Sequence, residues 1–360
     1  MTGRPVTGAV GGGAELTVEF LSQALAAHLD GASVDAVEAE RVGTGQVSDT
    51  YRLRLAYSGG GQRLPATLIA KVPAADEVSR GAARAFRTYE IEANFYAQLA
   101  SGLPVALPDC FYAAYDSERD EYVVLLADLA PAQPGDQLVG LTADEAAAAI
   151  GELAALHAAG WGSPELAALP WLNRSSPEAS ALMTAVVTDL FPGFRDRYAG
   201  RLEPGTLELI EGFVPRADRY LSDRNEPRTI VHGDFRADNL LFGPERPVVL
   251  DWQTTSFGSA TSDLSYFLGS SLPVPVRQEH EQDLVRLYHS TLTSREVPLT
   301  WAACWDGYRR NAFAGLVMDI IAAMVVQQTA RGDEMFAAMA SRHAQHAIDL
   351  EALALVADSR

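Results

Sequence analysis

The alternation of apolar and polar positions predicts strands in the first third of the chain. Residues 50–57 alternate polar and apolar side chains, and residues 67–72 form a short apolar run. The turn-rich segment 58–66 joins them, so we predict a β-hairpin. Two more strands are predicted around a polar turn within residues 109–129. A helical period predicts two helices in the same part of the chain, at residues 16–30 and 84–100.

Helical patterns dominate from residue 141 onward. Thr142 with Glu145 three residues later is a capping box, which predicts the start of a helix. The exception is the segment 229–257, where two short apolar runs near 229–231 and 248–250 flank a loop and a turn. The other helices predicted in this part cover residues 176–190, 203–222, 277–294, 302–328 and 333–356.

This change of pattern predicts an α+β fold with two parts. Pro131 and Pro134 mark a boundary near residue 130. We therefore expect a first domain at 1–127, with a flexible tail at 1–14, and a helical second domain at 128–360.

Composition and charge narrow the possible partners. Apolar residues make up 48% of the chain and charged residues 21%, as in an ordinary globular protein. A formal net charge of −19 disfavours binding to nucleic acid or to an anionic membrane surface, and it is compatible with a cationic substrate. We find no stretch with the length and apolarity of a membrane span and no secretory signal, and we expect a cytoplasmic protein. The two isolated cysteines fit a reducing compartment.

The basic residues of the chain are almost all arginine. Of the 28 basic residues, 27 are arginine and one is a lysine, Lys71. An arginine-biased genome would explain this, as would a site that needs a compact point charge, which arginine does not supply. Composition leaves both explanations open.

The strongest chemical pattern combines His232 and Asp234, then Asn239, then Asp251 directly after the apolar run 248–250. Phosphoryl transfer needs a carboxylate to accept the proton of the attacking hydroxyl, and it needs oxygen ligands for Mg²⁺. A base five residues before a metal-binding asparagine, with a second aspartate on the next strand, is the kinase arrangement. The alternative is that these residues only form turns. A zinc site is disfavoured because no second histidine lies nearby.

A second pattern is the glycine-rich segment that contains Gly43, Thr44, Gly45 and Ser48. Glycines let backbone N–H groups approach phosphate oxygens closely. A dinucleotide-binding turn would lead from a strand into a helix, whereas this segment leads into the predicted strand 50–57. It therefore favours a hairpin that covers bound ATP, and an ordinary glycine turn remains the alternative.

Lys71 lies inside an apolar strand, where an ammonium group needs a partner. Kinases pair such a lysine with a glutamate on a helix and place it against the nucleotide phosphates. Glu92 shares the apolar face of its predicted helix, whereas Glu90 is about 200° away around the helix axis and should face water. We therefore predict that Glu92 is the partner of Lys71.

Other positions carry weaker expectations. The apolar run at 123–131 would join the two domains, with the backbone of Ala127 and Leu129 reading the adenine edge. His232 is expected to brace its loop, and His157 to be a satisfied core histidine. Asp263 would either cap its helix or hydrogen-bond the loop from behind, and capping is the default interpretation.

With these motifs taken together, the sequence resembles the aminoglycoside phosphotransferase and choline kinase superfamily, and within it the ecdysteroid-kinase-like branch. The resemblance covers roughly residues 41–270. The stretches that carry it are RVGTGQVSDTYRLRL, LIAKVP, YEIEANFYAQL, VVLLADL, GDQLVGLTADEAAAAIGELAALHAAGW, VHGDFRADNLLFG and VVLDWQTTSFGSATSDLSYFLG.

The resemblance implies a two-lobed protein-kinase-like fold and ATP-dependent phosphorylation of a hydroxyl group. It implies that Asp234 is the base, that Asn239 and Asp251 bind Mg²⁺, and that Lys71 and Glu92 anchor the phosphates. The chain departs from protein kinases after Asp251, because no long activation segment follows. This departure fits a small-molecule substrate.

The acceptor stays open among an antibiotic, an amino-alcohol, a sterol and another natural product. A non-catalytic nucleotide-binding regulator on the same fold is the alternative function. A dinucleotide-dependent oxidoreductase is disfavoured by the context of the glycine segment.

Overall fold

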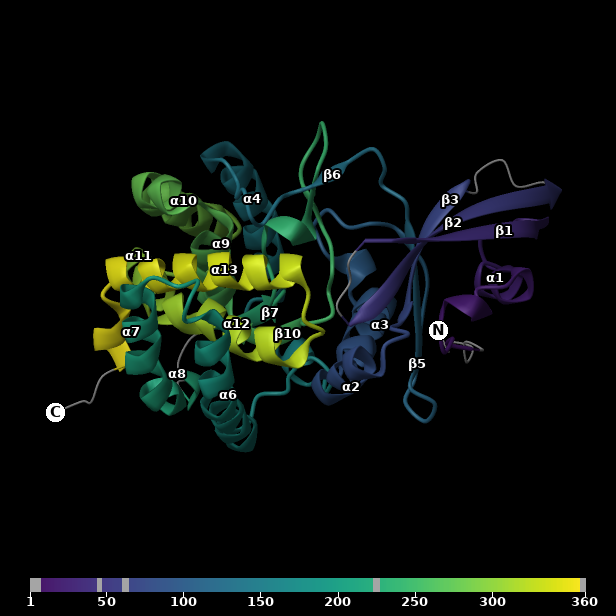
Figure 1. Ribbon diagram of the computed structural model, residues 1–360. Coiled ribbons are helices and arrows are strands. Elements are labelled where there is room, and N and C mark those ends of the chain that lie inside the picture. Colours follow the sequence, from purple (N-terminus) through teal and green to yellow (C-terminus); the bar gives the residue numbers. More distant parts are fainter. Residues whose placement is uncertain (1–7, 44–46, 60–64, 223–226, 357–360) are drawn as a thin grey trace. The chain divides into compact units, whose positions relative to one another are not determined.

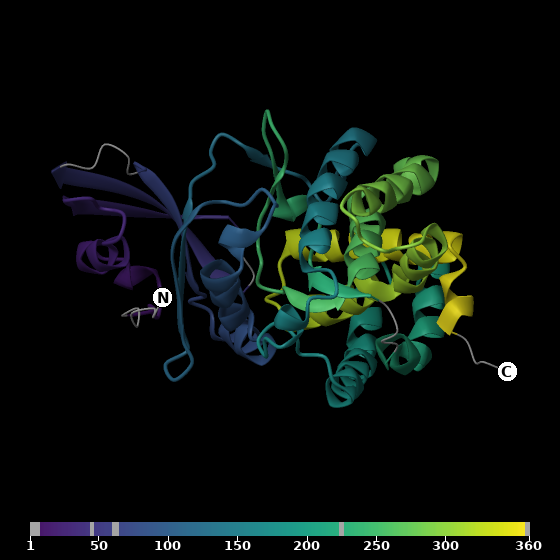
Figure 2. The same ribbon diagram turned by 180° about the vertical axis from the view of Figure 1, so that it is seen from behind.

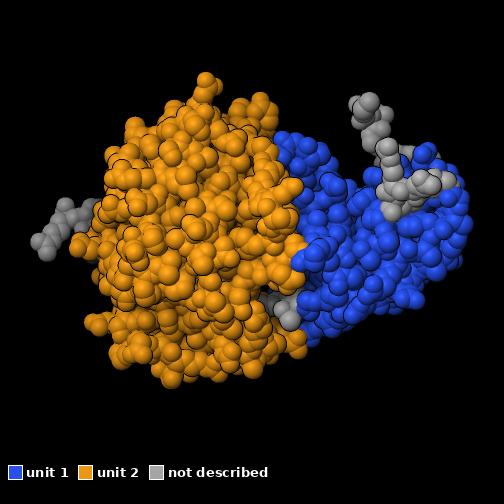
Figure 3. Space-filling view, turned by 90° about the horizontal axis from the view of Figure 1, so that it is seen from above, with its two compact units in different colours: residues 1–103, 107–131, 251–254 blue, residues 104–106, 132–250, 255–360 orange. Residues whose placement is uncertain are grey.

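The computed structural model describes residues 8–43, 47–59, 65–222 and 227–356. It divides into two units, which Figure 3 colours separately. Unit 1 contains residues 1–103, 107–131 and 251–254, and unit 2 contains the remaining segments, 104–106, 132–250 and 255–360. The short segment 251–254 thus belongs to unit 1, although its neighbours on both sides in the chain belong to unit 2.

Unit 1 is built on a five-stranded sheet in which all neighbouring strands are antiparallel (Figure 1). The strand order is β1-β2-β3-β5-β4. The strands are β1 (Ala32–Val42), β2 (Ser48–Gly59), β3 (Thr67–Pro73), β4 (Cys110–Asp116) and β5 (Glu121–Ala127). The predicted hairpin is confirmed as the β2–β3 pair, in which Thr50 lies opposite Lys71.

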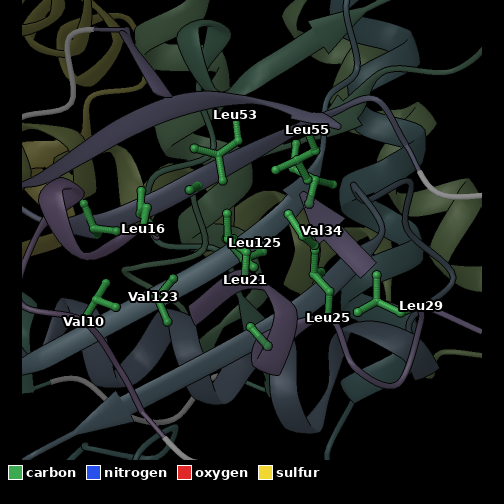
Figure 4. Packing of buried hydrophobic residues seen from close by; sticks show 14 residues of the cluster. Val10, Leu16, Leu21, Leu25, Leu29, Val34, Leu53, Leu55, Val123 and Leu125 are labelled. Atoms are coloured by element: carbon green, nitrogen blue, oxygen red, sulfur yellow. The ribbon is translucent and has the colours of Figure 1, made fainter. Parts of the chain in front are cut away.

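One face of this sheet is covered by the N-terminal segment and helix α1 (Val18–Ala24). Leu53 and Leu125 point from the strands into a buried apolar cluster, and Leu21 enters it from α1 (Figure 4). Ala70 of β3 belongs to the same cluster. Successive side chains of a strand point to opposite faces. Lys71, the neighbour of Ala70, therefore points to the other face, where α3 contacts β4 and β5.

The helix expected at 84–100 is two helices, and the prediction of one was wrong. They are α2 (Glu77–Phe86) and α3 (Thr88–Gln98), separated by Arg87 in a left-handed backbone conformation with φ 59°. A single left-handed residue ends the i to i−4 hydrogen-bond series, and the propensity of the surrounding residues does not reveal it. Strand β1 was not predicted, because among its residues only Val34 is buried and its apolar pattern is weak.

Unit 2 is mainly helical (Figure 2). Its helix α9 (Ala260–Ser271) is buried along almost its whole length. The other α-helices are α4 (Ala143–Gly160), α5 (Pro164–Ala167), α6 (Pro177–Tyr198), α7 (Pro204–Phe213), α8 (Ala217–Ser222), α10 (Val274–Ser294), α11 (Trp301–Arg310), α12 (Ala314–Val325) and α13 (Ala330–Asp349). The capping box of α4 is confirmed. The helix expected at 302–328 is interrupted by a 3₁₀ turn at Asn311–Phe313, so α11 and α12 are separate.

Short strands hold the loops of unit 2. Strands β7 (Arg228–Val231) and β10 (Ser256–Ser259) pair antiparallel, and a second small sheet has the order β6-β8-β9. Its strands are β6 (Gln133–Pro134), β8 (Leu240–Phe242) and β9 (Val248–Val249). The loop with the strongest chemical pattern in the sequence therefore runs from the end of β7 to β8, and its two ends are fixed by two different sheets.

Candidate functional site

In unit 1, the single lysine of the chain lies between two carboxylates. The ammonium Nζ of Lys71 donates to Glu92 Oε1 at 2.5 Å and to Asp251 Oδ1 at 2.7 Å. The other carboxylate oxygen of Glu92 accepts a hydrogen bond from the buried hydroxyl of Tyr122. The predicted pairing of Lys71 with Glu92 is therefore present, and Asp251 is a second partner that the sequence did not reveal.

The two negative charges hold Lys71 in its charged form. Burial by itself lowers the pKa of a lysine, but the charges of Asp251 and Glu92 outweigh burial and raise the pKa of Lys71 above its ordinary value. Glu90, in contrast, pairs with Arg87 at 2.7 Å near the helix surface. The helical period thus distinguished the two glutamates correctly.

Asp251 has an uncommon backbone conformation, with φ 64° in the left-handed region. Its Oδ2 accepts from Gln253 Nε2 at 3.2 Å. The next residue, Trp252, is fully buried and stacks on Phe95 of α3 with ring centroids 4.1 Å apart. The packed indole therefore fixes the segment, and an uncommon backbone conformation held in this way is a frequent mark of a functional position.

The glycine-rich segment connects β1 to β2, both in the antiparallel sheet. A strand on each side is the context of a hairpin and excludes the strand-to-helix turn of a dinucleotide-binding fold. Gly43 has φ 75°, a conformation that favours glycine. Ser48 is buried and begins β2 opposite Pro73. The predicted positions Thr44 and Gly45 lie outside the described residues.

The segment after β5 is held to the sheet. Arg52 Nε donates to Asp128 Oδ2 at 2.7 Å, and the N–H of Ala127 donates to the carbonyl of Asp109 at 2.8 Å. The N–H of Ala127 is therefore already engaged within unit 1. Leu129 follows two residues later and is half-buried.

In unit 2, the carboxylate of Asp234 accepts hydrogen bonds from three side chains. Tyr266 Oη donates to Oδ1 at 2.6 Å, and Asn239 Nδ2 donates to Oδ2 at 2.9 Å. Arg236 Nε donates to both oxygens, at 3.0 and 3.2 Å. Burial and the charge of Asp234 raise the pKa of Tyr266 well above its ordinary value, so the phenol keeps its proton and remains a donor.

Asp263 holds this loop from behind, and its default interpretation as a helix cap was wrong. The N-cap of α9 is Ser259. Asp263 lies inside the first turn of α9 and accepts from the backbone N–H groups of His232 at 2.6 Å and Gly233 at 2.9 Å. These amides follow β7, and the buried carboxylate supplies an acceptor for both of them.

The two predicted structural histidines are both fully buried. His232 Nε2 lies 2.8 Å from the carbonyl of Leu250, and its Nδ1 accepts from the N–H of Asp234 at 3.2 Å. These contacts require the tautomer with the proton on Nε2. His157 lies 2.6 Å from Tyr288 Oη and 3.3 Å from Asp263 Oδ2. The His232 ring therefore braces its loop, and the His157 ring has hydrogen-bond partners within the core.

The predicted metal-binding residues Asn239, in unit 2, and Asp251, in unit 1, each carry oxygen atoms of the kind that a hard divalent cation prefers. Asn239 uses its amide nitrogen for Asp234, at both the side chain and the carbonyl oxygen, which leaves the amide oxygen as its end for a metal. Asp251 supplies carboxylate oxygens. Mg²⁺ takes oxygen ligands, typically one or two from protein side chains with the rest from phosphates and water. In the described ranges, no group of three or more His, Cys, Asp or Glu side chains gathers in a way that could hold a metal by itself.

Sequence reasoning missed Tyr266, Arg236 and Tyr122 as parts of the two sites. Tyr266 follows Asp263 by three residues on one helix, so both face the same side of α9, and this spacing was a usable signal. Arg236 lies inside the recognised motif, but its direction depends on the loop backbone. For Tyr122, nothing in the sequence pattern distinguishes it from an ordinary core tyrosine.

Comparison with known proteins places the chain in a family. A sequence model of the ecdysteroid kinase-like family matches residues 43–297, more than half of the 360 residues. Acyl-CoA dehydrogenase family member 10 of Mus musculus is 42% identical over 93 residues, which is 24% of this chain and 8% of the relative. The chain thus corresponds to a small fraction of that relative.

Two solved structures share the fold. A candidate aminoglycoside phosphotransferase from Ralstonia eutropha has a TM-score of 0.52 at 18% identity, covering 92% of this chain and 98% of the other. Choline kinase from Cryptosporidium parvum has a TM-score of 0.53 at 11% identity, covering 88% and 89%. At these identities the likeness concerns the fold alone, and it confirms the predicted two-lobed α+β class.

No helix within the described ranges has the length and apolarity needed to cross a membrane. On the match over residues 43–297, the chain belongs to the ecdysteroid kinase-like family.

Proposed function

We propose that the protein transfers the γ-phosphoryl group of ATP to a hydroxyl group of a small molecule, with Mg²⁺ as the cofactor. The observation that carries the proposal is the placement of the only lysine, 2.5 Å from Glu92 and 2.7 Å from Asp251. A lysine fixed by a helix glutamate is the phosphate anchor of kinases. It also supports the functional explanation of a lone lysine among 27 arginines.

In this proposal Lys71 binds the α- and β-phosphates, and Glu92 keeps its ammonium group oriented. The backbone N–H groups near Gly43, Thr44, Gly45 and Ser48 bind phosphate oxygens. The carbonyl of Ala127 and the backbone of Leu129 hydrogen-bond the adenine. These roles belong to unit 1.

Asp234 orients the acceptor hydroxyl and accepts its proton as the oxygen attacks phosphorus. Tyr266 and Asn239 fix the carboxylate for this task. Asn239 and Asp251 would hold Mg²⁺, which when bound neutralises charge on the phosphates. His232 and Asp263 keep the loop in place.

The acceptor belongs to the class of small-molecule alcohols, and antibiotics, amino-alcohols, sterols and other natural products are the groups to test. The alternative is a non-catalytic nucleotide-binding regulator. It differs from the kinase only in turnover, since both bind Mg·ATP.

Release of ADP from Mg·ATP should be measured across a panel of aminoglycosides, macrolides, amino-alcohols and sterols. We expect release that depends on one acceptor class, and a loss of ~10²–10⁴ in rate in Asp234→Asn, the range for a general base. Calorimetric binding of Mg·ATP should persist in that variant. Asp196→Asn removes an exposed carboxylate on α6 and is the matched control.

Equal turnover by Asp234→Asn and the wild type would reject Asp234 as the base. Binding of Mg·ATP without turnover on any acceptor would favour the regulator. Absence of Mg·ATP binding would reject both functions.

A further inference from the structure

Arg236 is fixed between two carboxylates of the same loop. Its Nε donates to both oxygens of Asp234, at 3.0 and 3.2 Å, and its Nη1 donates to Asp238 Oδ2 at 2.9 Å. Asp238 is itself held, because its Oδ1 accepts from the backbone N–H of Gln137 at 2.9 Å. The Arg236 side chain is 15% exposed. The guanidinium group is therefore oriented by three hydrogen bonds to two anchored carboxylates.

The remaining nitrogen of Arg236 has a different environment. Nη1 also lies 3.6 Å from the sulfur of Met335, whereas Nη2 makes no hydrogen bond or ion pair with any residue in the described part of the chain. Some of the surface of Nη2 is exposed to solvent, because this atom is absent from the described side-chain atoms that are both buried and without a partner. In a planar guanidinium group Nη2 lies on the same edge as Nε, the edge that faces Asp234. A fixed cation thus presents N–H donors beside the carboxylate of Asp234.

The chemistry of transfer indicates what these donors would meet. The hydroxyl held on Asp234 attacks the phosphorus from a distance of about 3–3.5 Å. The oxygens of the moving phosphoryl group consequently come within a few ångströms of that carboxylate, and they carry the charge that develops in the transition state. A cationic donor already fixed at this place stabilises that charge without reorganisation.

We infer that Arg236 is a further catalytic residue, which donates from Nη2 to an oxygen of the transferred phosphoryl group; the inference rests on the proposed function. In the step, the acceptor oxygen forms a bond to phosphorus and the bond from phosphorus to the oxygen of ADP breaks. The hydroxyl proton passes to Asp234. Arg236 forms no covalent bond in this step and neither gains nor loses a proton. Arginine suits the position because one rigid group contacts Asp234, Asp238 and the phosphoryl oxygen together.

The test compares nucleotides with and without the γ-phosphate, so it needs no acceptor. Mg·ATP and Mg·ADP are titrated calorimetrically into wild type, Arg236→Met and the conservative variant Arg236→Lys. A lost hydrogen bond to a charged group predicts a Kd for Mg·ATP raised about 10-fold or more in Arg236→Met, with the Kd for Mg·ADP within about 3-fold. Arg236→Lys should recover part of the loss, because it keeps the charge but not the fork.

Arg331→Met is the matched control. Arg331 is about half exposed and pairs with the same Asp238 at 3.7 Å, but it has no described contact with Asp234. We expect it to leave both nucleotide affinities unchanged. Thermal melting shows whether each variant folds, and Arg236→Lys keeps the test valid if Arg236→Met does not fold.

A second titration addresses the transition state. Mg·ADP with aluminium fluoride mimics the transferring phosphoryl group, and Arg236→Met should weaken this complex by at least as large a factor as it weakens Mg·ATP. Equal weakening of Mg·ATP and Mg·ADP, or no weakening of either, overturns the role of Arg236. If the wild type binds neither nucleotide, the proposed function itself fails.

Discussion

At the scale of single residues, Asp319 on α12 is in an energetically costly environment. It is fully buried, and neither carboxylate oxygen has a hydrogen-bond partner in the described part of the chain. Burial raises its pKa well above the ordinary value, the charge of Asp234 raises it further, and Arg236 opposes both. An unpaired buried carboxylate costs free energy of folding whenever it must give up its proton.

Asp319→Asn should therefore stabilise the protein more at high pH than at low pH. A raised pKa in the folded state carries no penalty below the unfolded pKa of about 3.9, and the penalty grows as the pH rises toward the folded pKa. The free energy of unfolding, measured in urea at pH 5.0 and 7.5, should favour the variant increasingly, by up to about 1.4 kcal/mol per pH unit. Asp189→Asn, at an exposed position on α6, is the control. A difference that is equal at both pH values would contradict the assignment.

At the scale of elements, α9 organises the chemistry of unit 2. Asp263 and Tyr266 lie three residues apart, and they hold the backbone and the carboxylate of the same loop. Helix α9 also packs closely against α13. A side chain at Gly269 would meet the Nδ1 atoms of His343 and His346 at 2.7 Å, so α13 packs tightly against α9 there.

His343 also packs against α12, and this second contact predicts that glycine is required at position 315. A Cβ atom at Gly315 would lie 2.0 Å from Nε2 of the buried His343 ring. Although alanine is the better helix former, Gly315→Ala should destabilise the protein by about 1–3 kcal/mol through overpacking. Gly151→Ala on α4, where nothing lies within 4 Å, is the matched control and should stabilise by up to about 1 kcal/mol. Urea denaturation measures both, and a stabilising Gly315→Ala would contradict the packing.

At the scale of the whole molecule, charge and buried histidines set the response to acid. The chain carries a formal net charge of −19 and encloses His343 and His346 completely. Burial lowers the pKa of both rings, and neighbouring positive charges add to the effect at His343. Both are therefore neutral in the folded protein and protonate when it unfolds.

Acidification should destabilise the protein through these histidines. A lowered folded pKa contributes full stability above the unfolded pKa of about 6.5, and the contribution is lost as the pH falls from there toward the folded pKa. Between pH 7.5 and 5.5 the loss approaches about 1.4 kcal/mol per histidine. In urea denaturation across this range, His343→Gln should become more stable relative to the wild type as the pH falls, because the variant lacks one of these contributions. An identical slope in that variant would reject His343 as a contributor.

The sequence by itself determined the fold class, the hairpin that carries Lys71, the choice of Glu92 over Glu90 and the motif around Asp234. These features depend on periodicity and on the spacing of residue types, which are local properties of the chain. The sequence did not predict the helix ends at Arg87 and at 311–313, because a left-handed residue or a 3₁₀ turn leaves no periodic signal.

Only the tertiary structure showed that Asp251 pairs with Lys71, that Asp263 holds the loop rather than its own helix, and that Tyr266 and Arg236 converge on Asp234. Lys71 and Asp251 are 180 positions apart in the chain, and Asp234 and Tyr266 are 32 apart. The partner of a charged side chain is decided by which elements pack together. Packing depends on the sum of many long-range contacts, so spacing along the sequence fixes which residues are available but not which of them meet.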